Sequence, residues 1–153
     1  MSYQKILCPV DFSPPSESAL EAAVALATQS GGRVTVLHVV EMPDPLIEKS
    51  EFLEWITRRY EAQLKEFMHR HACPQVDEQA LLREGNPAPE INRAAEGLGA
   101  DVVVLGTHGR AGLKRWLLGS VAERVVRTSS VPSRSGAGRP PTDACTSDTV
   151  PPV

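Results

Sequence analysis

This chain of 153 residues has few cysteines, no long apolar run and no net positive charge. Its 3 cysteines are too few for a disulfide framework and odd in number, which points to a reducing compartment. No stretch approaches the roughly 18 apolar residues that a membrane span needs, and no signal peptide precedes the first apolar run. We therefore expect a cytoplasmic protein that has no membrane partner.

The balance of charge argues against general binding to duplex nucleic acid. The formal net charge is −3, whereas displacing counterions from phosphates requires a basic surface, so we expect no nucleic-acid partner. Hydrophobic residues make up 41% of the chain and charged residues 23%, an ordinary globular mixture. The length predicts a single domain.

Apolar runs typical of buried strands alternate with segments of helical periodicity. We expect strands over residues 6–10, 34–40, 76–83 and 101–105. Helices are expected after Ser13-Pro14, over about 47–71, after Asn86-Pro87 and from Gly119-Ser120. Strands joined by helices pair in parallel, and strands that are apolar on both faces need helices on both faces. The sequence therefore predicts an α/β fold, a single doubly wound, Rossmann-like parallel sheet with strand order 3-2-1-4.

The composition changes after Ser130. Val131-Pro132 resembles the start of another strand, but residues 133–153 are rich in Ser, Thr, Pro and Gly and have no apolar period. We expect a globular domain over residues 1–132, followed by a disordered low-complexity tail over 133–153.

The most informative stretch joins the fourth expected strand to the last expected helix. Gly106 and Gly109 would let the backbone approach a ligand closely, and Gly119-Ser120 would offer free N–H groups and a hydroxyl to a phosphate. Arg110 would add positive charge. Glycines that only form turns are an equally good interpretation of this motif by itself, because short glycine patterns often match by chance.

Two further residues end strands at the same edge of the expected sheet. The Asp11 carboxylate has two open roles there, either accepting hydrogen bonds from ribose hydroxyls or interacting with the dipole of the following helix. Val39 lies at the end of the second strand and can line an apolar slot for adenine, although such a valine is more often part of the core.

The order and spacing of these segments resemble the nucleotide-binding branch of the universal stress protein family. The family pattern is glycine, two residues, glycine, nine residues, glycine, then serine or threonine, which Gly106, Gly109, Gly119 and Ser120 match. Pro9-Val10-Asp11-Phe12-Ser13 matches the end of the family's first strand, and Leu37-His38-Val39-Val40 matches its second. The resemblance extends from about Tyr3 to Val131.

This resemblance implies an ATP-binding module of stress response or signalling, with slow or no hydrolysis. The residues implied around adenine and ribose are Pro9, Val10, Asp11 and Val39. Ser13 is also a candidate nucleotide-binding residue. Those implied beneath the ribose and at the phosphates are Leu105, Gly106, Gly109, Arg110, Gly119, Ser120 and Val121. Phosphate charge implies a divalent ion such as Mg2+, and no catalytic residue or protein metal ligand is expected.

The chain departs from the family pattern after Val131-Pro132. Family members usually continue with a fifth apolar strand, which often pairs across a homodimer, whereas polar residues follow here. We therefore expect the fifth strand to be missing or altered, an exposed edge on the fourth strand, and a weakened or altered homodimer.

Other functions fit the residues less well. Enzymes of similar fold that cleave the α–β bond of ATP resemble a Ser-Gly-Gly-x-Asp-Ser loop after the first strand, which residues 11–15 lack. The acidic pair of a phospho-receiver and the Gly-Lys-Ser/Thr ending of a P-loop are also absent.

Trp55 and Tyr60, on the long expected helix, are interpreted as core and partner surface. The remaining alternative is a protein-interaction module of the same fold that binds no nucleotide, and the intact glycine set counts against it.

Overall fold

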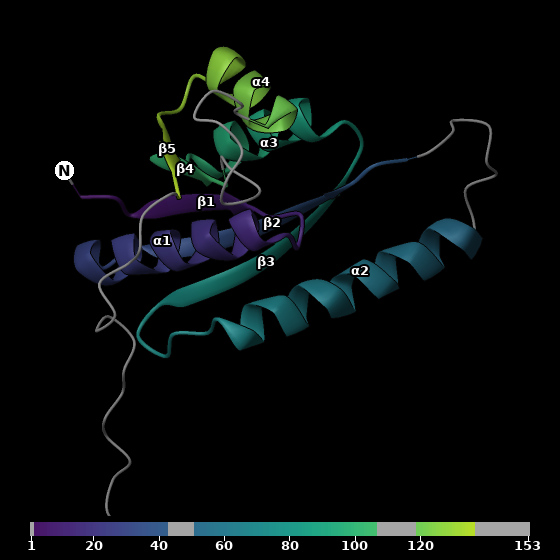
Figure 1. Ribbon diagram of the computed structural model, residues 1–153, viewed down its shortest axis with the longest axis horizontal. Coiled ribbons are helices and arrows are strands. Elements are labelled where there is room, and N and C mark those ends of the chain that lie inside the picture. Colours follow the sequence, from purple (N-terminus) through teal and green to yellow (C-terminus); the bar gives the residue numbers. More distant parts are fainter. Residues whose placement is uncertain (1, 43–50, 107–118, 137–153) are drawn as a thin grey trace, which may run out of the picture.

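Five parallel strands form one sheet in the order β3-β2-β1-β4-β5 (Figure 1). The structure, a computed structural model, describes residues 2–42, 51–106 and 119–136. The strands are β1 Lys5–Pro9, β2 Arg33–Val40, β3 Asp77–Glu84, β4 Val102–Leu105 and β5 Ser133–Ser135. The helices are α1 Pro14–Ser30, α2 Glu51–Arg70, α3 Pro87–Leu98 and α4 Ser120–Thr128. The predicted doubly wound fold and its strand order 3-2-1-4 are confirmed.

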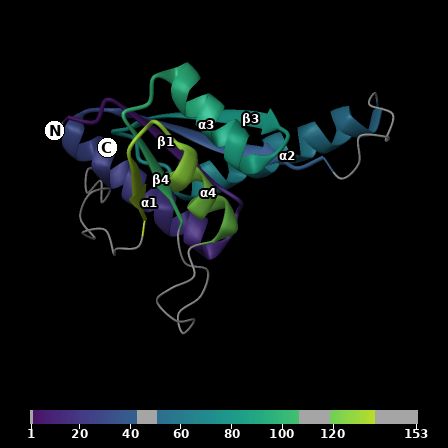
Figure 2. The same ribbon diagram turned by 90° about the horizontal axis from the view of Figure 1, so that it is seen from above.

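Two helices cover each face of the sheet (Figures 1 and 2). Successive side chains of a strand point to opposite faces, so β1 contributes Ile6 and Cys8 to the core beneath α1 and α2. The intervening Leu7 packs with residues of α3 and α4 on the other face. None of the helices within the described ranges is long and apolar enough to cross a bilayer.

Short capping signals set the helix boundaries. Ser13 precedes α1 as its N-cap, and a proline occupies its first turn, where the missing N–H costs no hydrogen bond. Gly31 and Gly99 end α1 and α3 in the left-handed conformation, with φ of +70° and +61°. The sequence predicted where both helices begin, near Ser13-Pro14 and Asn86-Pro87.

The prediction that the fifth strand is missing is wrong. β5 pairs in parallel with β4 from Val103↔Ser133 to Leu105↔Ser135, so it extends the sheet beyond the expected domain limit at residue 132. The Gly136 N–H continues the pairing by donating to the Leu105 carbonyl oxygen at 2.8 Å. β4 therefore has no exposed edge, and the predicted weakening of a homodimer loses the reason given for it. Residues 137–153 of the predicted tail lie outside the described residues.

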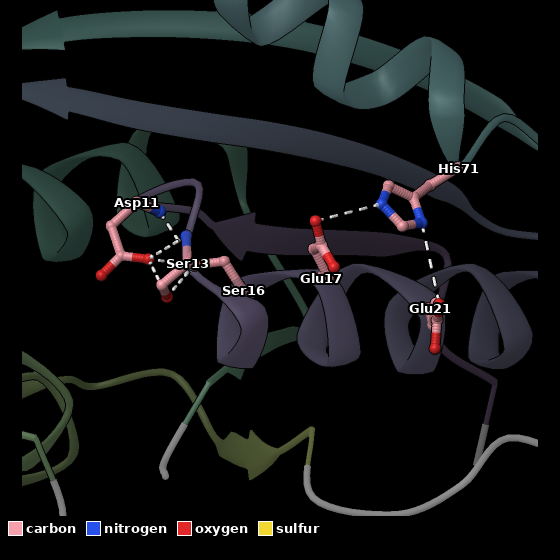
Figure 3. Close-up of polar contacts among 6 residues, drawn as sticks. All are labelled: Asp11, Ser13, Ser16, Glu17, Glu21 and His71. Carbon is pink, nitrogen blue, oxygen red and sulfur yellow. Dashed lines mark hydrogen bonds and ion pairs between the residues drawn. The ribbon is translucent and has the colours of Figure 1, made fainter. Parts of the chain in front are cut away.

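Helix α2 is anchored at its C-terminal end. Leu64 and Phe67 are its buried side chains, and His71, just past the helix, packs against the Phe67 ring at 5.3 Å between centroids. The His71 ring lies between two carboxylates of α1 (Figure 3), 4.0 Å from Glu17 and 3.7 Å from Glu21. The other end of α2 exposes Phe52 and Trp55 and extends past the sheet in Figure 1.

A half-buried carboxyl lies on β3. Burial raises the pKa of Glu78 to about 7, although a hydrogen bond from the Cys73 N–H partly offsets this. Among the residues that the structure describes, no group donates to its buried Oε1. The raised pKa means that the folded protein binds this proton more tightly than the unfolded chain.

We expect the protein to lose stability as the pH rises through about 7, because Glu78 then carries a half-buried charge with no donor to its Oε1 among the described residues. This stabilising contribution is complete below the unfolded pKa of about 4.5. Glu78→Gln should therefore change the free energy of unfolding more favourably at pH 8 than at pH 5. After allowance for solvent screening, we expect the two effects of the substitution to differ by about 1 kcal/mol. Urea titrations at both pH values measure this difference, with the exposed Glu84→Gln on the same strand as control. Parallel pH profiles for the Glu78 variant and the parent would contradict it.

Candidate functional site

A cavity of about 450 Å³ opens at the carboxyl ends of the strands. From β1 the chain moves outward to β2 and β3 and then returns to add β4 and β5 on the other side, so the strand order reverses between β1 and β4. Ligands of open α/β sheets bind in the crevice at such a point. The cavity is lined by Pro9, Val10, Asp11, Ser16, Leu37, His38, Val39, Glu41, Tyr60, Pro87, Ile91, Leu105, Gly106, Val121 and Ala122.

Asp11 is fixed by a tight turn between β1 and α1 (Figure 3). Its Oδ1 accepts hydrogen bonds from the Ser13 N–H at 3.0 Å, from the Ser13 hydroxyl, and from the Ser16 hydroxyl at 2.5 Å. The Asp11 N–H donates in turn to Ser16 Oγ at 2.8 Å. In Figure 3 the second carboxylate oxygen points away from both serines. One oxygen thus holds the turn, and the other faces outward from it.

The hydrogen bonds of this turn also stabilise the charge on Asp11. Partial burial by itself would raise the pKa of Asp11, but the hydrogen bonds from Ser13, Ser16 and the backbone outweigh burial and lower it. The carboxylate is therefore ionised at neutral pH and keeps an acceptor available at the cavity.

Gly106 is required by packing within the protein. A Cβ atom at this position would lie 2.6 Å from the Pro15 carbonyl oxygen and 2.7 Å from its carbon, so α1 can approach β4 only if residue 106 lacks a side chain. Gly106 also lines the cavity, so that the close approach of α1 shapes its floor.

Gly119 has no such packing role. Among the residues that the structure describes, a Cβ there would meet no atom within 4 Å, and its φ of −54° is accessible to any residue. It is the N-cap of α4, and no side chain caps that helix end. The first turn of α4 thus has backbone N–H groups that no carbonyl of the helix accepts from, and its residues Val121 and Ala122 line the cavity.

Most of the predicted site residues that the structure describes meet at this cavity. Those that line it are Pro9, Val10, Asp11, Val39, Leu105, Gly106 and Val121. Ser13 acts through Asp11, and Gly119 and Ser120 lie exposed at the start of α4, outside the lining itself. Gly109 and Arg110 lie outside the described residues.

Sequence reasoning missed several lining residues. Tyr60 was interpreted as core or partner surface, but it lines the cavity from α2. His38 and Glu41 flank Val39 at the end of β2, and Pro87 begins α3 at the same edge. The rule that strand ends converge at one edge could have found His38 and Pro87, whereas nothing local to Tyr60 indicates that α2 crosses the cavity.

The strand order and the helices on both faces are those of a doubly wound α/β domain. The profile of the universal stress protein family matches residues 2–133, so the chain belongs to the universal stress protein family.

Curated relatives agree with this assignment. Universal stress protein MJ0577 of Methanocaldococcus jannaschii is 30% identical over 151 residues, covering 85% of this chain and 92% of that protein. A universal stress protein of Thermus aquaticus is 34% identical over 133 residues and covers 85% of this chain and 96% of its own length.

Solved structures share the fold. The structure of MJ0577 has a TM-score of 0.75 at 30% identity and covers 88% of this chain and 96% of that chain. A universal stress protein in complex with cAMP has a TM-score of 0.66 at 21% identity, covering 88% of this chain and 97% of that chain. One from Archaeoglobus fulgidus in complex with dAMP has a TM-score of 0.60 at 22% identity, covering 88% of this chain and 98% of that chain.

Proposed function

We propose that this protein is a nucleotide-binding module that holds ATP in the cavity at the carboxyl edge of its sheet. The observation that carries the proposal is what meets at one cavity: the edge of β2 beyond Leu37, where pairing with β1 has ended, an ionised carboxylate, and residues of the first turn of α4. Complexes of related folds with cAMP and dAMP support an adenine nucleotide as the class of ligand. Family membership supports a role in stress response, which we place in the cytoplasm.

The strand end at Val39 suits an adenine base. Odd-numbered residues of β2 direct their backbone groups toward β1, as the Arg33 N–H and the Leu37 carbonyl show. The β1–β2 pairing ends at Pro9↔Leu37, so the N–H and carbonyl of Val39 come next along this edge, where β1 no longer pairs. A neighbouring donor and acceptor can bind the ring nitrogen and the amino group of adenine.

The ribose and phosphates would extend from Val39 toward α4. The free oxygen of Asp11 can accept from the ribose hydroxyls, and the first turn of α4 can donate to phosphate. Charged lining residues within the described ranges are the carboxylates Asp11 and Glu41, so the phosphate charge needs further compensation. Arg110 and a Mg2+ ion carried on the phosphates would supply it, because Mg2+ commonly binds phosphates with few protein ligands.

We expect Asp11→Asn to weaken ATP binding about tenfold, because a hydrogen bond to a charged acceptor is worth about 1.5–3 kcal/mol. Asparagine keeps an acceptor for Ser13 and Ser16 but replaces the outward oxygen with a donor. Isothermal titration of both proteins with ATP and Mg2+ measures the effect and tests the proposed function itself.

Asp101→Asn is the matched control for this titration. This substitution makes the same change of charge at the opposite edge of the sheet. There the Asp101 carboxylate accepts hydrogen bonds from the N–H groups of Gln4 and Lys5. It should bind ATP as the parent does. A parent protein that shows no heat of binding at millimolar ATP would refute the proposed function, and equal affinities for Asp11→Asn and the parent would refute the role of Asp11.

A further inference from the structure

We propose that His38 is a positioning residue that keeps the Val39 N–H available to the nucleobase. This inference rests on the proposed function for its ligand, but its structural basis lies in how β1 and β2 separate. His38 is part of the cavity lining, and its imidazole belongs to β2, the strand that carries Val39.

Regular parallel pairing of β1 and β2 would include one more backbone hydrogen bond, donated by the Val39 N–H, than is found among the described residues. In the β1–β2 ladder the Arg33 N–H donates to Gln4 and the Val10 N–H donates to Leu37, at 2.9 and 2.8 Å. Continuing this alternation, the next rung would join the Val39 N–H to the Val10 carbonyl. Among the residues described, the hydrogen bonds outside regular strand pairing do not include this rung.

The imidazole of His38 takes the place of that rung. Its Nδ1 lies 2.8 Å from the Val10 carbonyl oxygen, and because a carbonyl only accepts, Nδ1 is the donor. The side chain of the residue before Val39 thus satisfies the acceptor that the Val39 N–H would otherwise use. The consequence is a backbone donor left at the cavity without a partner from β1.

Aromatic packing holds the imidazole in this orientation. The rings of Phe12 and Tyr60 lie on it, with centroids 4.5 and 4.9 Å away. Phe12 adopts a φ of +66°, a left-handed conformation that is unfavourable for a residue with a large side chain. Phe12 lies in the turn between β1 and α1, and its ring packs against Phe67 at 5.6 Å between centroids. The strained turn, the ring stack and the hydrogen bond together keep the two strand ends apart.

Two substitutions separate the hydrogen bond from the packing. His38→Leu keeps an apolar side chain of similar bulk but removes the donor, which frees the Val10 carbonyl to pair with the Val39 N–H. His38→Asn places an amide nitrogen at the same distance along the side chain as Nδ1, so it restores the donor.

The first measurement is isothermal titration with ATP and with inorganic tripolyphosphate, which lacks a base. We expect His38→Leu to bind ATP about tenfold more weakly and tripolyphosphate as the parent does, because one hydrogen bond to the base is lost. His38→Asn should bind ATP within about twofold of the parent. Equal ATP affinities for the parent and His38→Leu, or equal losses for both ligands, would overturn the inference.

The second measurement needs no nucleotide. Amide hydrogen exchange should be fast at Val39 in the parent and slower in His38→Leu, where the extra rung forms. A parent Val39 amide that is already protected would overturn the inference even if neither variant folds. A parent that binds no ATP but shows the expected exchange would refute the proposed function and leave the role of His38 in the strand separation supported.

Discussion

Gly106→Ala should lower the free energy of unfolding by about 1–3 kcal/mol, the range found when extra atoms are forced into a packed site. The added Cβ would lie 2.6 Å from the Pro15 carbonyl oxygen and 3.0 Å from its Cβ. These atoms belong to the first turn of α1, which the turn at Asp11 and the core beneath α1 hold in place. Urea denaturation followed by circular dichroism measures the change.

Gly97→Ala is the matched control for this substitution. Gly97 lies within α3, where an added Cβ meets nothing within 4 Å. Alanine is favoured over glycine in a helix interior, so this variant should gain up to about 1 kcal/mol. If Gly106→Ala unfolds at the same urea concentration as the parent, the close approach of α1 to the end of β4 is not what requires glycine at this position.

Gly119→Val should abolish most ATP affinity and leave the fold intact. Among the described residues, a Cβ at Gly119 would meet no atom within 4 Å, and a φ of −54° is accessible to valine. The free energy of unfolding should therefore fall by no more than about 1 kcal/mol, because valine is a poorer N-cap residue than glycine. The branched side chain would stand where phosphate must approach the first turn of α4. Loss of about two charge-assisted hydrogen bonds corresponds to roughly 100-fold weaker binding of ATP.

Adenosine distinguishes a local effect on the phosphates from a general one. It lacks phosphates, so the parent and Gly119→Val should bind it equally well in the same titration. If Gly119→Val binds ATP with unchanged affinity, the phosphates do not lie on α4. If it loses adenosine as well, the substitution has changed the cavity and not only the approach of phosphate.

The sequence predicted those parts of the fold that depend on side-chain chemistry. The apolar run that ends at Leu105 and the helix starts near Ser13-Pro14 and Asn86-Pro87 mark elements that the structure contains. β5 escaped prediction because Ser133, Arg134 and Ser135 join the sheet through backbone hydrogen bonds and have no apolar pattern. An edge strand of three residues leaves too little periodicity to detect.

The candidate site was predictable to the extent that strand ends determine it. Asp11 follows β1 and Val39 lies near the end of β2, and the structure places both at one cavity. Gly106 is different, because the motif presents it as a ligand-binding glycine while its contact with Pro15 already explains why no side chain is tolerated. Tyr60 reaches the cavity only through the packing of α2 across the sheet, which periodicity cannot reveal.

The most direct test of the account is a crystal structure of the protein with ATP and Mg2+ at millimolar concentration. We predict adenine against the backbone of Val39, a ribose hydroxyl on the outward oxygen of Asp11, and phosphates on the first turn of α4. Density for ATP at another surface, or a cavity at the carboxyl edge that holds no nucleotide at saturating concentration, would contradict it.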